Sequence, residues 1–292
     1  MTLRILLTGG TGQLGRALAK TLPGLGTVSA PPRAEFDLAS EHSMLRVLDR
    51  MRPDLIVNAA AYTAVDRAES EPDRALLVNG AAPSVMAGWA ARRGAAIVQY
   101  STDYVFDGTV SRPYCEDDAA NPVNAYGRSK LAGEVAVRES GAAHLVIRTS
   151  WLYAAEGNNF PHTILRLARE NETLRIVDDQ IGAPTSAAWL AQATAEILAA
   201  SPLRGGALHA AAAGSVSWHG FATAIVERAR ARGLPVKAKT ITAIPTSAFP
   251  TPAARPGNSV LALDRLRREH GIVPPPWREQ LDAVFASSTF TT

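Results

Sequence analysis

Short apolar runs alternate with longer amphipathic segments along the first half of this chain. The apolar runs predict β-strands, and the segments between them, in which apolar residues recur at helical spacing, predict α-helices. Such alternation predicts an α/β fold with a doubly wound parallel sheet that helices cover on both faces. The predicted strands are residues 3–8, 27–30, 55–58, 95–101 and 145–149, and the predicted helices are residues 12–22, 41–51, 72–93 and 123–139.

The first predicted strand runs directly into a glycine-rich turn, which a helix follows. Its three regularly spaced glycines suit a tight turn, a close approach of the backbone to a pyrophosphate, and close helix packing. The start of the helix adds unpaired amide groups and a positive dipole end. A purely structural turn can share this spacing, but its place after the first strand indicates a Rossmann-type nucleotide site. The turn residues predicted to bind the cofactor are Gly9, Gly12, Gln13, Leu14 and Gly15.

The regular alternation weakens beyond Trp151, where prolines punctuate shorter elements. We therefore predict that residues 1–151 form an NAD(P)-binding Rossmann domain, to which parts of later segments return. Residues 152–292 should mainly form a smaller C-terminal lobe that binds substrate.

Composition excludes several classes of protein. The chain has 292 residues, 47% of them apolar, and a net charge of +3, which together indicate a globular protein with a large core. Its basic residues are scattered, so nucleic acid is not an expected partner. Cys115 is the only cysteine and the six histidines lie far apart, so we predict neither a disulfide nor a structural metal site. The apolar stretches are too short for a signal-peptide core or a membrane span, which predicts a cytoplasmic protein.

Tyr126 and Lys130 form the most informative pair in the chain. They stand one helical turn apart and therefore share a face of the predicted helix. A tyrosine hydroxyl titrates at about 10, and a nearby ammonium group favours its phenolate. The pair predicts a proton donor, although an idle pair on an exposed helix is the alternative. The helix also has a predicted start, with Asn121 as its cap and Pro122 at the first helical position.

Small, hydroxyl-bearing and aromatic residues follow three successive predicted strands. Ligands of such sheets bind beyond the carboxyl ends of the strands, so these residues are expected to lie at one site. The segments are residues 58–63, 101–106 and 148–153. Ordinary loop residues are the alternative, but three such strand ends in succession favour a binding site. The residues after the third strand that are predicted to face a cofactor are Ala60, Ala61, Tyr62 and Thr63.

Several of these segments resemble the extended short-chain dehydrogenase/reductases and, within them, the dTDP-4-dehydrorhamnose reductase family. The resemblance extends over nearly the whole chain. The segments that carry it are residues 101–108, 148–153, 157–160, 178–185 and 250–256.

The resemblance implies an NAD(P)H-dependent reduction of the C4 ketone of dTDP-4-dehydro-β-L-rhamnose to dTDP-L-rhamnose, the last step of dTDP-L-rhamnose biosynthesis. By resemblance, Tyr126 would protonate the developing alkoxide and Thr102 would donate to the same oxygen. Lys130 would lower the pKa of the tyrosine and bind the nicotinamide ribose. The implied substrate contacts are Thr102, Asp103, Trp151, Asn159, Gln180 and Arg255, the last of which suits a diphosphate.

Three other functions are compatible with the same fold. Dehydratases of the superfamily usually carry a glutamate where this chain has Tyr104, so the base for dehydration is missing. A reductase of another nucleotide-linked 4-keto sugar stays open, because the choice of sugar depends on pocket shape. A noncatalytic NAD(P)-binding regulatory subunit of the methionine adenosyltransferase type would also keep the fold. The complete set of Thr102, Tyr126 and Lys130 favours an enzyme, although it does not prove turnover.

The cofactor choice depends on the residues after the second predicted strand. An acidic residue there would bind the ribose 2′-hydroxyl and favour NAD, but this chain has Pro31, Pro32 and Arg33. Arg33 suits a 2′-phosphate, so we predict NADPH as the cofactor and NADH as an alternative, unless Arg33 is merely a solvated loop residue. Asp37 and Leu38 are expected beside the adenine.

Some members of the family are described as magnesium dependent, with carboxylates at a subunit contact. This chain has Ala17, Ala187 and Ala188 where such acids are expected. We therefore predict a monomer or a metal-free homodimer and regard a magnesium requirement as doubtful.

Overall fold

A six-stranded parallel sheet forms the centre of the molecule in the computed structural model, which describes residues 2–200, 203 and 205–287. All neighbouring strands in this sheet pair in parallel. In sheet order the strands are β2 (Gly26–Ser29), β1 (Leu3–Thr8), β3 (Leu55–Asn58), β4 (Ala96–Thr102), β5 (Ala143–Thr149) and β10 (Ala207–His209). The α/β class and the Rossmann-type doubly wound sheet predicted from the sequence are therefore confirmed.

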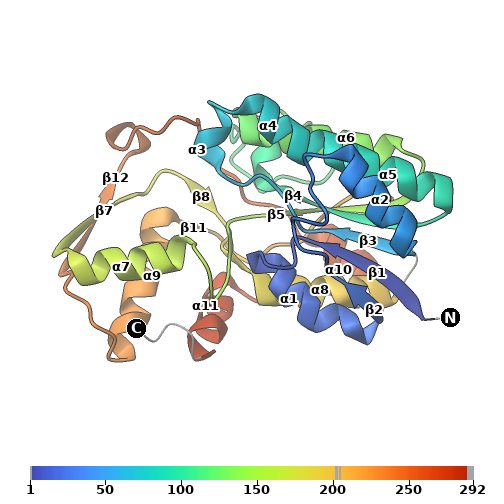
Figure 1. Cartoon of the computed structure of the whole chain (residues 1–292). Coiled ribbons are helices and arrows are strands. Elements are labelled where there is room, and N and C mark those ends of the chain that lie inside the picture. Colours follow the sequence, from blue (N-terminus) through green and yellow to red (C-terminus); the bar gives the residue numbers. More distant parts are fainter. Residues whose placement is uncertain (1, 201–202, 204, 288–292) are drawn as a thin grey trace.

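Helices cover both faces of this sheet (Figure 1). Because side chains alternate across a strand, Ile5 and Leu7 pack into the core on one face and Leu6 into the core on the other. On the first face lie α1 (Gln13–Thr21), α8 (Ala187–Ala200) and α10 (Asp264–His270), and on the second lie α2 (Glu41–Met51), α5 (Ala82–Arg93) and α6 (Ala125–Glu139).

The predicted helix over residues 72–93 is one continuous helical segment with a π-helical turn inside it. It comprises α4 (Pro72–Leu76), the turn Leu77–Ala81 and α5. Within the turn, the Asn79 side chain holds both backbone polar groups of Tyr62, accepting from its amide at 2.8 Å and donating to its carbonyl at 2.9 Å. Asn79 therefore fixes the chain that follows β3.

The helix that carries Tyr126 starts later than predicted. Asn124, not Asn121, is its cap, and the Asn124 side chain accepts a hydrogen bond of 2.7 Å from the amide of Gly127. Asn121 lies before the helix and donates to Asp107 instead. The sequence-based prediction was wrong because the buried Asn124 is also held by a distant part of the chain, through a 2.8 Å bond from its Nδ2 to the carbonyl of Ala254.

The second half of the chain builds a lobe with its own core, seen at the left of Figure 1. Aromatic and aliphatic side chains from its helices pack against a two-stranded parallel sheet. The elements of this lobe are α7 (Phe160–Glu170), α9 (Trp218–Ala231), α11 (Trp277–Ala286), β7 (Thr173–Val177) and β12 (Thr240–Ile244). The remaining short elements are α3 (Val65–Ala68), β6 (Leu152–Tyr153), β8 (Ile181–Gly182), β9 (Thr185–Ser186), β11 (Val216–Ser217) and 3₁₀ turns at 22–24, 103–105 and 246–248.

Two elements of the second half return to the central sheet. β10 pairs with β5 and completes its edge, and α8 packs beside α1 on one face. Across the described ranges, no helix combines the length and the apolar character that a membrane span needs.

The strand order also places a crevice. The chain leaves β1 for β2 on one side of the sheet, while β3 and the later strands lie on the other side, so the connections diverge at the carboxyl ends of β1 and β3. Ligands of doubly wound sheets bind at such a switch point. Beneath it, buried polar side chains link three strands: Thr8 donates to Asn58 at 2.5 Å, and Asn58 donates to Gln99 at 2.7 Å.

Candidate active site

A cavity of about 1010 Å³ opens beyond the carboxyl ends of β1, β3, β4 and β5. Residues 8–14 border it at one end, and the strand ends at residues 59–65 and 100–104 form its floor. Residues 151–153, 158–160 and Trp218 close it on the side of the C-terminal lobe. The three strand-end segments singled out in the sequence therefore contribute to one cavity.

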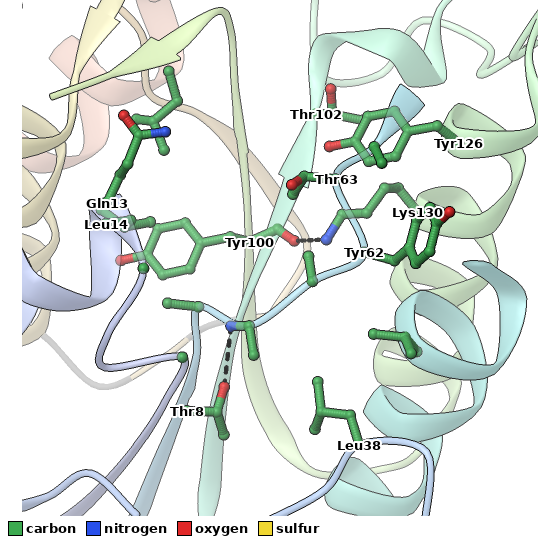
Figure 2. Close-up of a pocket in the computed structure, with 18 of the residues that line it drawn as sticks. Thr8, Gln13, Leu14, Leu38, Tyr62, Thr63, Tyr100, Thr102, Tyr126 and Lys130 are labelled. Carbon is green, nitrogen blue, oxygen red and sulfur yellow. Dashed lines mark hydrogen bonds between the residues drawn. The ribbon is translucent and has the colours of Figure 1, made fainter. Parts of the chain in front are cut away.

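The glycine turn is packed tightly at Gly9 and Gly15, where a side chain has no room. Gly9 has a φ of +66°, and a Cβ atom there would lie 2.8 Å from the amide nitrogen of Ala60. The Thr8 hydroxyl accepts a 3.1 Å bond from the same amide, as Figure 2 shows. A Cβ atom on Gly15 would lie only 1.9 Å from the carbonyl oxygen of Gly9. Gly15 does not line the cavity, so its role in this structure is to let α1 pack on the turn.

The cavity fits a dinucleotide. Gly12 is the cap residue of α1 and has no side chain to occupy the amides of the first helical turn, which leaves them for an anion. Apart from Gly15, every residue predicted to bind the cofactor lines this one cavity. Those residues are Gly9, Gly12, Gln13, Leu14, Arg33, Asp37, Leu38, Ala60, Ala61, Tyr62, Thr63, Tyr126 and Lys130.

Tyr126 and Lys130 lie on one face of α6, next to Thr102 at the end of β4 (Figure 2). Burial raises the pKa of Tyr126 to about 12, and the negative charge of Asp103 adds to this effect, while a hydrogen bond with Thr102 opposes it. The predicted lowering of the Tyr126 pKa by Lys130 is not found in the structure. The Lys130 ammonium group donates instead to the carbonyl oxygen of Tyr100, at 2.6 Å. Tyr126 is consequently protonated at neutral pH, as an acid catalyst must be.

Lys130 is itself buried, with 3% of its surface exposed. Burial lowers its pKa to about 8, and the negative charge of Glu134, one turn further along α6, opposes that shift. Glu134 is fully buried and forms an ion pair of 2.7 Å with Arg148 on β5. Lys130 therefore stays mostly charged at neutral pH but lies close to its titration range.

The Thr102 hydroxyl points toward a carboxylate. It donates to Asp103 at 3.0 Å and accepts from the amide of Tyr104 at 3.2 Å. The other oxygen of Asp103 accepts a 2.9 Å bond from Ser150. Burial raises the pKa of Asp103 to about 6, although hydrogen bonds from Ser259, Ser150 and Thr102 lower it again. When Asp103 is ionised, the proton of Thr102 is directed to Asp103 and not into the cavity.

Trp151 and Asn159 border the cavity on the lobe side. Asn159 caps α7 and also donates to the Gln13 side chain at 2.9 Å, which links the lobe to the glycine turn. Trp151 has a φ of +45°, a conformation that bulky residues rarely adopt. Its indole ring stacks on that of Trp218, with ring centres 3.4 Å apart and planes within 1° of parallel.

Comparisons with known proteins agree with this site. The family described as "RmlD substrate binding domain" matches residues 3–290. A dTDP-4-dehydrorhamnose reductase of Burkholderia thailandensis is 50% identical over 94% of this chain and 96% of its own length, and one of Salmonella typhimurium is 43% identical over 98% and 100%. The chain belongs to the dTDP-4-dehydrorhamnose reductase family. The crystal structure of the Bacillus anthracis reductase, in complex with NADP, superposes with a TM-score of 0.92 and 35% identity, covering 99% of this chain and 100% of that one.

Two residues that the resemblance to this reductase family suggested for the substrate do not reach the cavity. Gln180 is buried, and its side chain donates to Thr246 at 3.0 Å. Arg255 forms an ion pair of 2.9 Å with Asp66 on α3. Neither lines the cavity, so the structure does not bring them together with Thr102 and Trp151.

The cavity of this reductase family member also contains residues that were not predicted from the sequence. Thr8 is the polar last residue of β1, and the same strand-end rule would have found it. Arg67 and Arg74 follow β3 and pair with Glu71, a pattern typical of any exposed helix. Trp218 comes from a region where no element was predicted, so nothing in the sequence indicated its position.

Among the residues that the structure describes, no group of three or more His, Cys, Asp or Glu side chains could hold a metal ion. Ala17 and Ala187 lie instead in the apolar core beneath the sheet.

Proposed function

We propose that this chain reduces the C4 ketone of dTDP-4-dehydro-β-L-rhamnose to dTDP-L-rhamnose with NADPH, the last step of dTDP-L-rhamnose biosynthesis, in the cytoplasm. The observation that carries the proposal is the convergence of Thr102, Tyr126 and Lys130 in a cavity that begins at the glycine turn. Full-length relatives named for this reaction support the choice of substrate.

The proposed reaction needs a cofactor and a proton donor. NADPH, when bound, supplies the two electrons and the hydrogen that the ketone carbon takes up. The glycine turn, Arg33 and residues 59–63 would hold it, because they line the cavity from one end to Tyr126. The hydroxyl of Tyr126 gives its proton to the C4 oxygen as negative charge develops there.

Lys130 and Thr102 assist Tyr126 in this proposal. The charged Lys130, one helical turn from Tyr126 on α6, favours negative charge that develops in this part of the cavity, since burial strengthens electrostatic interactions. Thr102 donates a hydrogen bond to Asp103 and lies within hydrogen-bonding reach of the Tyr126 hydroxyl, so it helps to position that hydroxyl. We further propose that residues 152–292 mainly bind the nucleotide sugar, with Asn159 as one contact, and that Trp151, which precedes this segment, is another.

The test of this function is NADPH oxidation that depends on the dTDP-4-keto-6-deoxy-L-sugar, in wild type and in Tyr126→Phe. The variant should lose turnover by about 10²- to 10⁴-fold, the usual contribution of a positioned acid, while it still binds NADPH. Tyr114→Phe is the matched control, because it removes another tyrosine hydroxyl outside the cavity. Turnover that survives in Tyr126→Phe would remove its proposed role. A folded wild type that binds NADPH but leaves the sugar unreduced would contradict the proposed substrate.

We also propose NADPH as the preferred cofactor, with NADH as the second. Arg33 is exposed and lines the cavity, where its guanidinium group suits a ribose 2′-phosphate. Arg33→Ala should reduce the ratio of NADPH to NADH affinity by about 10- to 100-fold, the value of a charge-assisted hydrogen bond. Arg46→Ala, on the neighbouring α2 but outside the cavity, should leave the ratio unchanged. An unchanged ratio in Arg33→Ala would assign the preference to other residues.

The proposed assembly is a monomer or a homodimer that needs no magnesium. It is supported by the alanines at 17, 187 and 188, which offer a cation no ligand side chain. The mass in solution, measured by light scattering, should be the same in magnesium and in a chelator. A mass that falls in the chelator would contradict this proposal.

A further inference from the structure

The indole of Trp218 covers one face of Trp151 in this structure. At 3.4 Å between ring centres and 1° between planes, the two rings are in full contact and nothing can enter between them. Both residues border the cavity and both keep part of their surface exposed. Trp151 follows β5, whereas Trp218 is the first residue of α9, so the pair joins the sheet to the lobe.

Of the two, Trp151 is the fixed partner. Its left-handed backbone conformation persists only where the surroundings enforce it. Gly182 is part of that enforcement, because a Cβ atom there would lie 2.4 Å from Cε2 of the Trp151 ring. The indole nitrogen of Trp151 is buried and finds no hydrogen-bond partner among the residues that the structure describes. The Trp151 ring is thus held by shape and not by a polar contact.

Trp218 is the partner that can move. Its backbone is the ordinary first turn of a helix, capped by Ser217 through a 3.0 Å bond to the amide of Gly220. A change of its side-chain rotamer needs no change in this backbone. Its other neighbour is the Phe160 ring, tilted by 47° at 4.5 Å between centres, and Phe160 borders the same cavity.

The position of Trp151 indicates what would replace Trp218. Thr102 and Thr149 are paired across β4 and β5, and Trp151 follows Thr149 by two residues. Between them, Ser150 donates to Asp103 next to Thr102. Trp151 therefore lies at the reacting end of the cavity, where a sugar ring and not a nucleobase has to sit. The flat face of an indole suits the C–H face of a pyranose.

We propose that Trp218 is a gate of the substrate site, which covers the face of Trp151 in the free protein and leaves it when the sugar ring of the nucleotide sugar binds. The inference rests on the proposed function, since it takes the sugar of that reaction as the occupant. It assigns a role to a residue of the lobe that contributes no acid, base or charge.

Circular dichroism tests the gate without any turnover, because two stacked indoles produce a coupled pair of bands. Wild type should show these bands, and Trp218→Phe should lose them. Trp189→Phe, on α8 and outside the cavity, should keep them. Adding dTDP-L-rhamnose should abolish the bands in wild type, whereas dTDP alone, which has no sugar ring, should leave them.

Calorimetry on the same samples separates the outcomes. Bound dTDP-L-rhamnose with unchanged bands would overturn the gate and leave the proposed function standing. Loss of the bands with dTDP alone would assign the displacement to the nucleotide and overturn the gate as stated. Failure to bind dTDP-L-rhamnose, in a protein that binds NADPH, would overturn the proposed function and the gate with it.

Affinity gives a second test. Trp218→Ala should bind dTDP-L-rhamnose about 2- to 10-fold more tightly than wild type, because the sugar no longer has to displace an aromatic partner. Trp151→Ala should bind it more weakly. Weaker binding by Trp218→Ala would make Trp218 a wall of the site and not its cover, which would overturn the gate. Trp218→Phe serves for the same comparison if the alanine variant does not fold.

Discussion

The side-chain amide of Asn124 donates a 2.8 Å hydrogen bond to the carbonyl of Ala254, which lies 130 residues further along the chain. The oxygen of the same amide caps α6, two residues before Tyr126. One buried side chain therefore joins the start of the helix that carries Tyr126 to a loop of the C-terminal half.

Asn124→Ala should lower the free energy of unfolding by about 2 kcal/mol. About 1 kcal/mol comes from the lost helix cap, and about 1 kcal/mol from the lost hydrogen bond to the partly buried carbonyl of Ala254. Asn121→Ala should cost under about 1 kcal/mol, since it removes one exposed bond to Asp107. Equal losses for Asn121→Ala and Asn124→Ala in urea titrations would contradict this account.

Asp103 should make the protein less stable as pH rises from about 4 to 6. Burial raises the pKa of Asp103 to about 6, whereas its pKa in the unfolded chain is about 3.9. Between these pH values the folded chain still binds the proton and the unfolded chain has released it. Asp103→Asn removes this loss. Relative to wild type, its free energy of unfolding should increase by about 3 kcal/mol from pH 4 to 7, at about 1.4 kcal/mol for each of roughly two pKa units.

A matched control has the opposite sign. The hydrogen bond from Arg4 lowers the pKa of Asp54, so its contribution to stability is present at neutral pH and is lost as pH falls. Asp54→Asn should therefore lose stability relative to wild type as pH rises, whereas Asp103→Asn gains it. Urea titrations at several pH values give both slopes. If the difference in free energy of unfolding between Asp103→Asn and wild type does not change with pH, the pKa of Asp103 is not raised in the folded protein.

Lys130 should limit activity at alkaline pH. Burial lowers its pKa to about 8, so the free enzyme loses this positive charge as pH rises through that value. Tyr126 stays protonated until about 12, so its own titration cannot cause the change. The value of kcat/KM for reduction should fall above pH about 8. In Lys130→Arg, whose guanidinium group stays charged, the remaining activity should show no such fall. An identical alkaline limb in this variant would assign the titration to another group.

Tyr153 carries a hydroxyl group that weakens the fold. The side chain is 1% exposed, and its hydroxyl meets no hydrogen-bond partner in the described part of the chain. Tyr153→Phe should therefore stabilise the protein by about 1–2 kcal/mol. Tyr114→Phe should destabilise it by a similar amount, because the Tyr114 hydroxyl donates to Asp107 at 2.8 Å and accepts from the amide of Thr109 at 3.0 Å. If the melting temperatures of both variants shift in the same direction, this comparison is contradicted.

The sheet and half of the cavity could be predicted because their signals are local. A parallel strand buried on both faces is a short apolar run, and the polar residues that follow neighbouring strands must meet at one edge. Tyr126 and Lys130 share a face through helical spacing alone. These rules place the glycine turn, residues 59–63 and Thr102 together without knowledge of any contact between distant parts of the chain.

The remaining site residues depend on contacts that no local pattern encodes. Trp218 reaches Trp151 only because β11 pairs with β8 and brings the start of α9 over the cavity. Arg255 looked suited to a diphosphate by its chemistry, but its position is decided by Asp66. The direction in which the Thr102 hydroxyl donates is likewise set by Asp103. The Asp103 carboxylate is buried against Ser150 and Ser259, which come from two later segments.

The return of β10 and α8 to the sheet has a consequence for how this protein can be divided. A fragment that stopped at residue 151 would leave β5 as a bare edge and strip the cover from one side of α1. An exposed strand edge promotes aggregation, and the apolar surface of α1 would be exposed to solvent. The nucleotide-binding half is therefore not a portable module. Recombination that exchanges the second half between relatives has to carry over an edge strand and a covering helix together with the lobe.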